Sequence, residues 1–316
     1  MTSVSSRELG KAERFPDAAG RYIEFCKSTI PHRVSFKGMK VVVDCANGAA
    51  YHIAPDVFHE LGADVVAIAN SPDGFNINDA CGSTHPEQLQ KEVMRQQADI
   101  GIALDGDGDR VLMVDGSGNC VDGDQILYVM ARTRRQSNRL YGGVMGTLMS
   151  NLGLEKACEH MRIPFKRSAV GDRYVLQGLR ENHWTLGGET SGHIICLDKS
   201  TTGDGIIAAL EVVHAMVQSA TSLADLCSGM HRYPQQMINV TVANGSSEFR
   251  HYINDDASVC AAIADAESRL AGNGRVVLRP SGTEPVIRVM VEGDDALEVD
   301  HISQELAEVV KIAARS

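Results

Sequence analysis

Apolar and polar positions along residues 15–121 follow the spacing of helices and strands in turn. Phe15, Ala18, Tyr22 and Cys26 lie at helical spacing and predict a helix over residues 15–27. A β-branched strand at 39–43, a helix at 50–61 and a strand at 64–69 follow, and this order predicts a right-handed parallel crossover. A helix over 86–97 and two strands on either side of a polar turn at 105–110 complete this first unit.

Residues 122–232 repeat this alternation and predict a second unit of the same kind. Helices are expected over 125–134, 151–161, 174–182 and 204–218, with strands over 143–147 and 164–168 and two more within 184–197. From about Tyr233, strands at 237–242, 275–279 and 286–292 and helices at 257–270 and 296–314 no longer alternate regularly. The predicted fold class is α/β: two consecutive mixed-sheet α/β domains, 37–121 and 122–232, followed by a C-terminal α+β domain, 233–316.

Composition narrows the classes of function. The net charge of the 316 residues is −11, which argues against a nucleic-acid partner, because binding to the phosphate backbone needs a basic surface. A small anionic substrate stays possible, because a few focused arginines override the global charge. No apolar run is long enough to span a bilayer, so no membrane partner is expected. The eight cysteines are scattered singly, and we expect reduced thiols in a cytoplasmic protein.

The turn at 105–110 carries the strongest chemical signal. Asp105, Asp107 and Asp109 stand at alternate positions, and the glycines between them allow all three carboxylates to converge. Converging carboxylates repel one another, so a hard divalent metal ion is the expected partner, and the adjoining Arg110 offers donors to a phosphate. A plain polar hairpin turn is the alternative. An EF-hand is rejected, because Arg110 and Gly116 stand where that loop needs Gly and Glu.

Two further loops predict a phosphorylated sugar as ligand. In 279–285, the flanking Arg279, the hydroxyls of Ser281 and Thr283 and the flexible Gly282 can surround a phosphate, and Arg288 on the next strand can reach it. A hairpin loop built only for turning is the alternative. In 188–193, a carboxylate and a hydroxyl two residues apart point the same way and suit neighbouring sugar hydroxyls. These are Glu189 and Ser191, with His193 at the end of the loop; Arg173, in a predicted loop at 170–173, is a weaker candidate for substrate contact.

These three motifs, in this order, resemble those of the α-D-phosphohexomutase superfamily. The matching stretches are Asp105-Gly-Asp-Gly-Asp-Arg110, Gly188-Glu-Thr-Ser-Gly-His193 and the run from Arg279 to Gly293. The chain looks most like the bacterial phosphoglucosamine mutases, on account of the segments 76–78 and 81–87 and of Ser281-Gly282-Thr283. The resemblance extends over nearly the whole chain.

The resemblance implies an activity and a set of roles. Such enzymes interconvert glucosamine 6-phosphate and glucosamine 1-phosphate through glucosamine 1,6-bisphosphate, which also acts as activator, and feed UDP-N-acetylglucosamine and cell-wall synthesis. It implies that Asp105, Asp107 and Asp109 hold one Mg²⁺ and that Arg110 steadies the transferring phosphoryl group. The implied substrate-binding residues are Arg173, Glu189, Ser191, His193, Arg279, Ser281, Gly282, Thr283 and Arg288.

One departure from the family pattern is important. The phosphoserine of these enzymes lies in a Thr-Ala-Ser-His-Asn-Pro loop of their first domain, and this sequence has no such loop. We therefore expect residues 1–36 to be a remnant of that domain with a linker helix, and the chain by itself to be inactive. A phosphosugar- and metal-binding module, a phosphomannomutase/phosphoglucomutase and an unrelated metal-dependent hydrolase are the alternatives. The sequence leaves the oligomeric state open.

Overall fold

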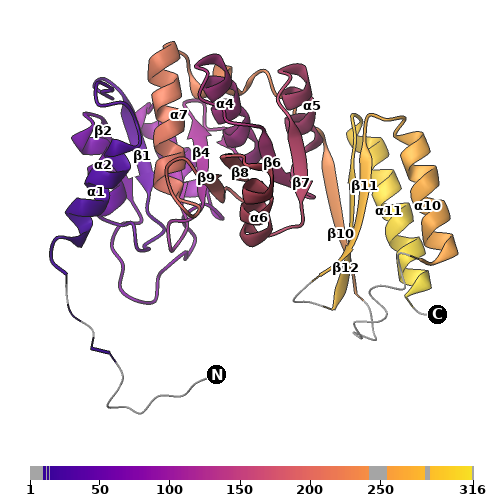
Figure 1. Ribbon diagram of the computed structural model, residues 1–316. Coiled ribbons are helices and arrows are strands. Elements are labelled where there is room, and N and C mark those ends of the chain that lie inside the picture. Colours follow the sequence, from indigo (N-terminus) through magenta and orange to yellow (C-terminus); the bar gives the residue numbers. More distant parts are fainter. Residues whose placement is uncertain (1–9, 12, 14, 242–254, 282–284, 315–316) are drawn as a thin grey trace.

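The computed structural model describes residues 10–11, 13, 15–241, 255–281 and 285–314. Three units follow one another along the chain (Figure 1), in the order that the sequence pattern predicts. None of the helices in these described residues is long and apolar enough to cross a membrane.

The first unit is a five-stranded mixed sheet in the order β2-β1-β3-β4-β5. Strand β1 pairs in parallel with β2 and β3, whereas β4 is antiparallel to both β3 and β5. Strand β3 is buried along its whole length, as expected for a central strand covered on both faces. The elements are α1 (Ala18–Ser28), β1 (Lys40–Asp44), α2 (Ile53–Glu60), β2 (Asp64–Ile68), α3 (Glu87–Gln96), β3 (Ile100–Leu104), β4 (Val111–Asp115) and β5 (Cys120–Val121).

The second unit is a four-stranded mixed sheet in the order β7-β6-β8-β9. Strand β6 is parallel to β7 and β8, and β9 returns antiparallel to β8. The elements are α4 (Gly123–Gln136), β6 (Val144–Thr147), α5 (Leu152–His160), β7 (Phe165–Ser168), α6 (Asp172–Asn182), β8 (Leu186–Gly188), β9 (Ile194–Cys196), α7 (Gly205–Ser219) and α8 (Leu223–Cys227).

Helix α7 joins these two units into one body. It lies between their sheets (Figure 1) and contacts β3 and β4 on one side and α4 and β9 on the other. Its residues from Ile206 to Met216 are all buried, and one apolar core runs from Ile23 in α1 to Met230. The two α/β units therefore share a core.

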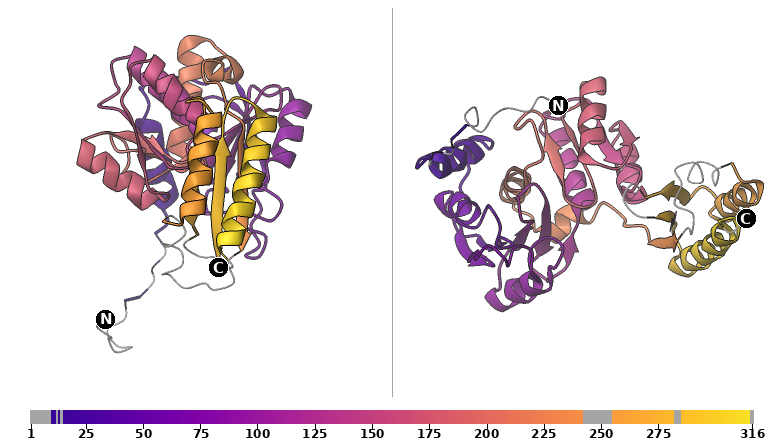
Figure 2. Two further views of the ribbon diagram at one scale, coloured as in Figure 1. Left: turned by 90° about the vertical axis from the view of Figure 1, so that its right-hand side faces the viewer. Right: turned by 90° about the horizontal axis from the view of Figure 1, so that it is seen from below.

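The third unit is a three-stranded antiparallel sheet with two helices packed on one face. The strands lie in the order β10-β12-β11, and α10 and α11 cover the face that carries Val289 and Val291. This unit has a core of its own and extends as an arm from the rest of the molecule (Figure 2). The elements are β10 (Gln235–Thr241), α10 (Ala257–Arg269), β11 (Arg275–Pro280), β12 (Val286–Glu292) and α11 (Ala296–Ala313).

Two details of the predicted elements are corrected. Helix α6 begins at Asp172 rather than Tyr174, because Gly171 takes the N-cap position, so Arg173 lies in the first helical turn and not in a loop. The short helix α8 was not predicted; Ser222 caps it, accepting a hydrogen bond from the backbone N–H of Asp225, and its apolar residues complete the shared core. All eight cysteines are free thiols, as expected.

Candidate functional site

The three aspartates of the turn at 105–110 converge, as their spacing predicts. They follow β3 and precede β4, and one carboxylate oxygen of each lies within 4.8 Å of the others. The backbone N–H of Arg110 donates to Asp105 Oδ1 over 3.0 Å, and Gly108 takes a positive φ of 78°, which closes the turn. We call Asp105, Asp107 and Asp109 the aspartate triad.

The electrostatics of the triad suit a hard divalent cation. Burial, together with the charges of Asp109 and Asp107, raises the pKa of Asp105 to about 6. The guanidinium of Arg110 offsets part of the negative charge, with Nε 3.8 Å from Asp105 Oδ2 and 3.8 Å from Asp109 Oδ1. Oxygen donors with a surplus of negative charge are the ligands that Mg²⁺ prefers, so the residues present fit this ion.

A buried aspartate in the neighbouring loops holds the triad's turn in place. Asp44, at the end of β1, is fully buried and accepts hydrogen bonds from the N–H groups of Ala46 and Gly82, both at 2.9 Å. The loops that it ties down also contact the turn at 105–110, which we call the metal turn, and the end of β3 that leads into it. The N–H of Ala49 donates to Gly106 O over 2.8 Å, and that of Ser83 donates to Leu104 O over 2.9 Å.

The loop at 188–193, which we call the sugar loop, is joined directly to the triad. Arg110 and His193 form an antiparallel bridge, and the N–H of Val111 donates to Gly192 O over 3.1 Å. The His193 side chain is 3% exposed, and its Nδ1 lies 3.2 Å from Asp109 Oδ2. The structure therefore places His193 against a member of the triad, while the predicted contact of His193 with the sugar stays a prediction.

The polar side chains of the sugar loop are held from its other side by the start of α6. Glu189 Oε1 accepts a hydrogen bond from the N–H of Gly171 over 2.9 Å. Arg173 is exposed in the first turn of α6, with its guanidinium 5.0 Å from the centre of the Tyr174 ring. Ser191 is exposed. Glu189 and Arg173 thus belong to neighbouring segments, as a shared substrate would require.

Two arginines lie side by side on the face of the third unit's sheet that its helices leave free. Arg279 on β11 and Arg288 on β12 are cross-strand partners, and we call them the arginine pair. Burial and the charge of Arg288 lower the pKa of Arg279, and the negative charge of Glu189 acts in the opposite sense. Arg279 Nε is buried and has no hydrogen-bond partner among the described residues. Two like charges held together in this way favour an anionic ligand.

Of the three remaining residues that were predicted to bind phosphate, the structure describes one. Ser281 is 2% exposed, and its N–H donates to Val286 O over 2.9 Å. Gly282 and Thr283 lie outside the described residues.

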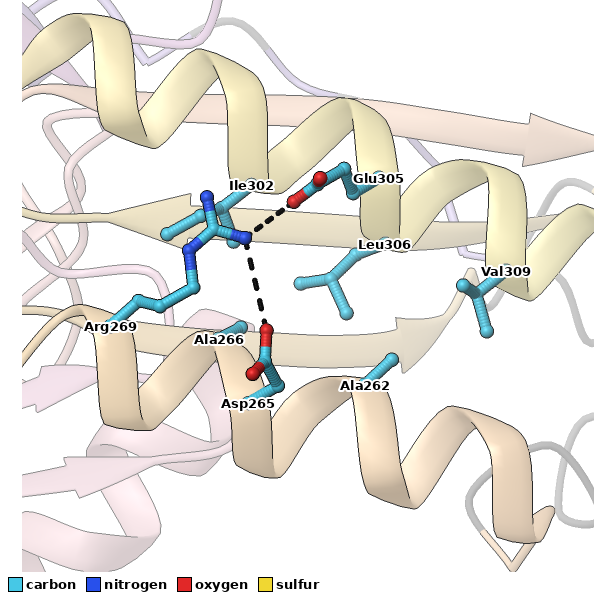
Figure 3. A pocket seen from close by; sticks show the side chains of 8 residues that line it. All are labelled: Ala262, Asp265, Ala266, Arg269, Ile302, Glu305, Leu306 and Val309. Atoms are coloured by element: carbon cyan, nitrogen blue, oxygen red, sulfur yellow. Dashed lines mark hydrogen bonds and ion pairs between the residues drawn. The ribbon is translucent and has the colours of Figure 1, made fainter.

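A hollow of about 400 Å³ between α10 and α11 lies apart from these residues (Figure 3). Its one arginine, Arg269, is already paired with Asp265 at 3.8 Å and with Glu305 at 2.5 Å. Because these helices cover the face of the sheet opposite to the arginine pair, the hollow does not belong to the candidate site.

Sequence reasoning missed the side chains that connect the second and third units. Glu292 and Arg275 bond across to the segment 148–152, and Asp124 holds that segment from within the second unit. Asp124 and Glu292 have no exposed surface. The sequence marks Asp122-Gly123-Asp124 as a helix start, and Asp122 caps α4 as part of a capping box. Nothing in that pattern shows that Asp124 is buried between two loops.

Models of known protein families match most of the chain. Three models match in sequence order: phosphoglucomutase/phosphomannomutase alpha/beta/alpha domain II at residues 20–118, alpha/beta/alpha domain III at 122–233 and the C-terminal domain at 237–309. The first of these matches includes residues 20–36, which were expected to belong to a remnant of the first domain with a linker helix. Those residues contain most of α1, which packs on α2 and α7 in the shared core.

Similar proteins and structures agree with these matches. Phosphoglucosamine mutases of Thiobacillus denitrificans and Actinobacillus pleuropneumoniae are 55% and 57% identical over 314 and 311 residues, or 99% and 98% of this chain and 68% and 69% of theirs. A phosphoglucomutase/phosphomannomutase family protein of Burkholderia thailandensis shares the fold with a TM-score of 0.77 at 22% identity, over 93% of this chain and 64% of that one. The Aspergillus fumigatus N-acetylphosphoglucosamine mutase, solved with GlcNAc-6P and magnesium, gives 0.73 at 21%, over 92% and 70%.

Fold and domain order together define a protein of the phosphohexomutase class. At 55% identity to relatives that it covers by more than two thirds, the chain belongs to the phosphoglucosamine mutase family of isomerases. It spans about two thirds of the length of these curated relatives.

Proposed function

We propose that these residues form the metal- and phosphosugar-binding part of an enzyme that interconverts glucosamine 6-phosphate and glucosamine 1-phosphate. One observation carries the proposal. The sugar loop is bonded to the metal turn through Val111 and Gly192, and its Glu189 acts electrostatically on Arg279 of the third unit. The proposed metal-binding, sugar-binding and phosphate-binding motifs thus belong to three successive units and are linked in pairs, an arrangement that suits a single phosphorylated sugar.

Each motif has a role in this proposal. The aspartate triad holds one Mg²⁺, which when bound neutralises charge on a transferring phosphoryl group. Arg110 adds a guanidinium beside it, and His193 fixes the orientation of Asp109. Glu189 and Ser191, with Arg173 near them, receive the sugar hydroxyls. The arginine pair, with Ser281 and the predicted contacts of Gly282 and Thr283, holds the phosphate that does not react.

The wider setting follows from the family. The transfer proceeds through glucosamine 1,6-bisphosphate, which also acts as activator, and the product feeds UDP-N-acetylglucosamine and cell-wall synthesis in the cytoplasm. Phosphosugars are the only ligands besides the metal that the proposal needs.

A second candidate is a module that binds metal and phosphosugar but does not turn substrate over. Ser83-Thr84-His85-Pro86 is the nearest match in this sequence to the family's phosphoserine loop. Ser83 Oγ is buried without a hydrogen-bond partner among the described residues, a position that does not suit a group which must meet a substrate. This observation favours binding without turnover for the 316-residue chain by itself.

An assay of two proteins separates the candidates. The 316-residue chain and the same chain fused behind the first domain of a curated relative would be given glucosamine 6-phosphate, Mg²⁺ and glucosamine 1,6-bisphosphate. We expect formation of glucosamine 1-phosphate only with the fused protein, and loss of that activity in its Asp107→Asn variant. Activity of the short chain would refute the second candidate.

The same assay tests the choice of sugar. Mannose 1-phosphate and glucose 1-phosphate would be offered as competing substrates. Faster turnover of either would assign the chain to phosphomannomutase/phosphoglucomutase chemistry instead. If the fused protein is inactive on all three sugars but the short chain binds glucosamine 6-phosphate, the binding module is the better description.

A further inference from the structure

The sheet of the third unit carries two charged pairs on the face that its helices leave free. Strands β11 and β12 pair Arg275 with Glu292 and Arg279 with Arg288. Both pairs stand on the same face, because side chains four residues apart on a strand point the same way. At a rise of about 3.4 Å per residue, the two pairs lie roughly 14 Å apart along the strands. Contacts that hold the pair Arg275–Glu292 in place therefore also determine the position of the arginine pair on the same strands.

The first pair is anchored to the backbone of the second unit. Glu292 is fully buried; its Oε2 accepts from Arg275 Nε over 2.7 Å, and its Oε1 accepts from the N–H of Leu152 over 2.8 Å. The other guanidinium nitrogens of Arg275 donate to Leu148 O over 2.8 Å and to Ser150 O over 2.6 Å. The two partners of this ion pair therefore both form hydrogen bonds to the backbone of segment 148–152.

The same segment is tied to the sugar loop through Asp124. Its Oδ2 accepts from the N–H of Asn151 over 2.8 Å and from the hydroxyl of Thr190 over 2.7 Å. The N–H of Gly123 donates to Thr190 O over 3.0 Å, and a Cβ at Gly123 would overlap Glu189 O, so the loop sits directly on the start of α4. The segment 148–152 therefore lies between the third unit and the sugar loop and is bonded to both.

The connection between the units is fixed at the same place. Asn151 Oδ1 accepts from the N–H of Tyr233 over 3.0 Å, and Asn151 Nδ2 donates to Tyr233 O over 3.0 Å. Tyr233 immediately precedes Pro234 and β10, where the chain enters the third unit. The orientation of the third unit is thus set by hydrogen bonds to residues 148–152.

We propose that Arg275, Glu292 and Asp124 form an interdomain joint that positions the arginine pair opposite the sugar loop. They are positioning residues, since they act through segment 148–152 and the strands. Removal of one partner of the buried pair leaves an uncompensated charge at the interface, so the third unit loses its fixed orientation. The joint itself rests on geometry alone, whereas its effect on ligand binding rests on the proposed function.

The geometric part is tested by a distance measurement. Spin labels would be placed on Cys260, which is exposed on α10, and on a cysteine introduced at the exposed Lys156 of α5. Protein without the introduced cysteine gives the background from other thiols. We expect a narrow distance distribution in the parent and a broad one in Arg275→Met. Arg269→Met is the matched control, because Arg269 pairs with Glu298 and Glu305 within the third unit (Figure 3 shows Glu305). An unchanged distribution in Arg275→Met would overturn the joint.

Glu292→Gln provides a second variant in case Arg275→Met does not fold. The amide keeps the size of the side chain and can still accept from the N–H of Leu152, but the ion pair is lost. The same broadening is expected, and a narrow distribution in a folded Glu292→Gln would count against the proposal.

The functional part is tested by binding of glucosamine 6-phosphate, measured by calorimetry in the presence of Mg²⁺. We expect Arg275→Met and Glu292→Gln to weaken binding by about tenfold, as for residues that act as a unit, and to leave Mg²⁺ affinity unchanged. In an Arg279→Met background, Arg275→Met should cost nothing further, because the group that it positions is absent. Additive losses would assign Arg275 a merely structural role.

The two proposals fail in different ways. If the parent protein does not bind glucosamine 6-phosphate, the proposed function fails, and the joint is decided by the distance measurement. If the parent binds it and the distance broadens without any loss of affinity, the joint exists but does not position the phosphate site, and the proposal is wrong.

Discussion

At the scale of single residues, His193 lies against one member of the aspartate triad, which we propose as a metal ligand. Its ring is buried, and Nδ1 lies 3.2 Å from Asp109 Oδ2. His193 thus lies against one oxygen of Asp109, while the other oxygen lies 3.8 Å from Arg110 Nε. Partners of this kind orient metal ligands and tune metal affinity.

Replacing His193 by Ala is expected to weaken Mg²⁺ binding by roughly 10- to 100-fold, because Asp109 loses the group that orients it. Calorimetric titration with Mg²⁺ measures the effect. His160→Ala, at an exposed position near the end of α5, is the control and should bind as the parent does. Equal affinities of His193→Ala and the parent would contradict the role assigned to His193.

Asp124 predicts a pH dependence of stability. Burial and the charge of Asp122 raise its pKa to about 6, while bonds from Asn151, Thr190 and Ser150 act in the opposite sense. The folded protein holds this proton to a higher pH than the unfolded chain, so the free energy of unfolding falls as pH rises from about 4 to about 6. In Asp124→Asn this contribution disappears.

The size of the effect follows from the shift. The stability of Asp124→Asn relative to the parent should increase between pH 4 and pH 7, by on the order of 2–3 kcal/mol. Urea unfolding at the two pH values measures it, and the comparison cancels the other carboxyl groups. A difference between the two proteins that does not change with pH would show that Asp124 does not carry this titration.

At the scale of elements, the metal turn depends on close approach of two loops. The turn after β1 places Ala46 and Asn47 at positive φ, 53° and 46°, and brings Gly48 against the backbone of Gly106. A Cβ on Gly48 would overlap Gly106 O, the acceptor of the hydrogen bond from Ala49. Only glycine fits where two backbones meet so closely.

Gly48→Ala is therefore expected to displace the metal turn. We expect a loss of about 1–3 kcal/mol in stability, as for other overpacked sites, together with weaker Mg²⁺ binding. Gly20→Ala is the matched control. Its Cβ would make an ordinary contact of 3.5 Å with Asp17 Oδ1 within α1, and alanine favours the helix. Thermal unfolding and Mg²⁺ titration of both variants measure the difference; a parent-like Gly48→Ala would remove the argument from close approach.

At the scale of the whole molecule, the two largest apolar cores of the described residues divide the chain into two bodies rather than three, and two smaller clusters belong to the sheets of the α/β units. One core runs from Ile23 to Met230 through both α/β units, and the other from Val240 to Ala313 belongs to the third unit alone. Polar contacts of residues 148–152 join the two bodies. Cores that do not mix are expected to unfold separately.

Calorimetry should therefore resolve two unfolding transitions. Ile302→Ala removes a buried side chain from the smaller core and should destabilise that transition alone, by about 2–5 kcal/mol. Leu154→Ala removes a buried side chain from the larger core and should lower the temperature of only that core's transition. If both variants shift one common transition equally, the two bodies unfold as a unit.

The sequence by itself determined the local features of this protein. The aspartate triad follows from spacing at alternate positions with glycine between, and most helices and strands follow from the period of their apolar residues. These are short-range effects, since backbone angles and neighbouring side chains decide them. The ordered motifs also predicted the family, which the domain matches and relatives confirm.

Tertiary structure alone decided which loops meet. Asp109 with His193, Arg275 with Ser150, and Asp124 with Asn151 are contacts between segments far apart in sequence, and so is the packing of α7 between two sheets. Burial and charge at such contacts depend on the packing of whole units, so no local pattern reveals them. The sequence determines that three carboxylates converge in the turn at 105–110. The position of that turn relative to the sugar loop and the arginine pair is determined only by the tertiary structure.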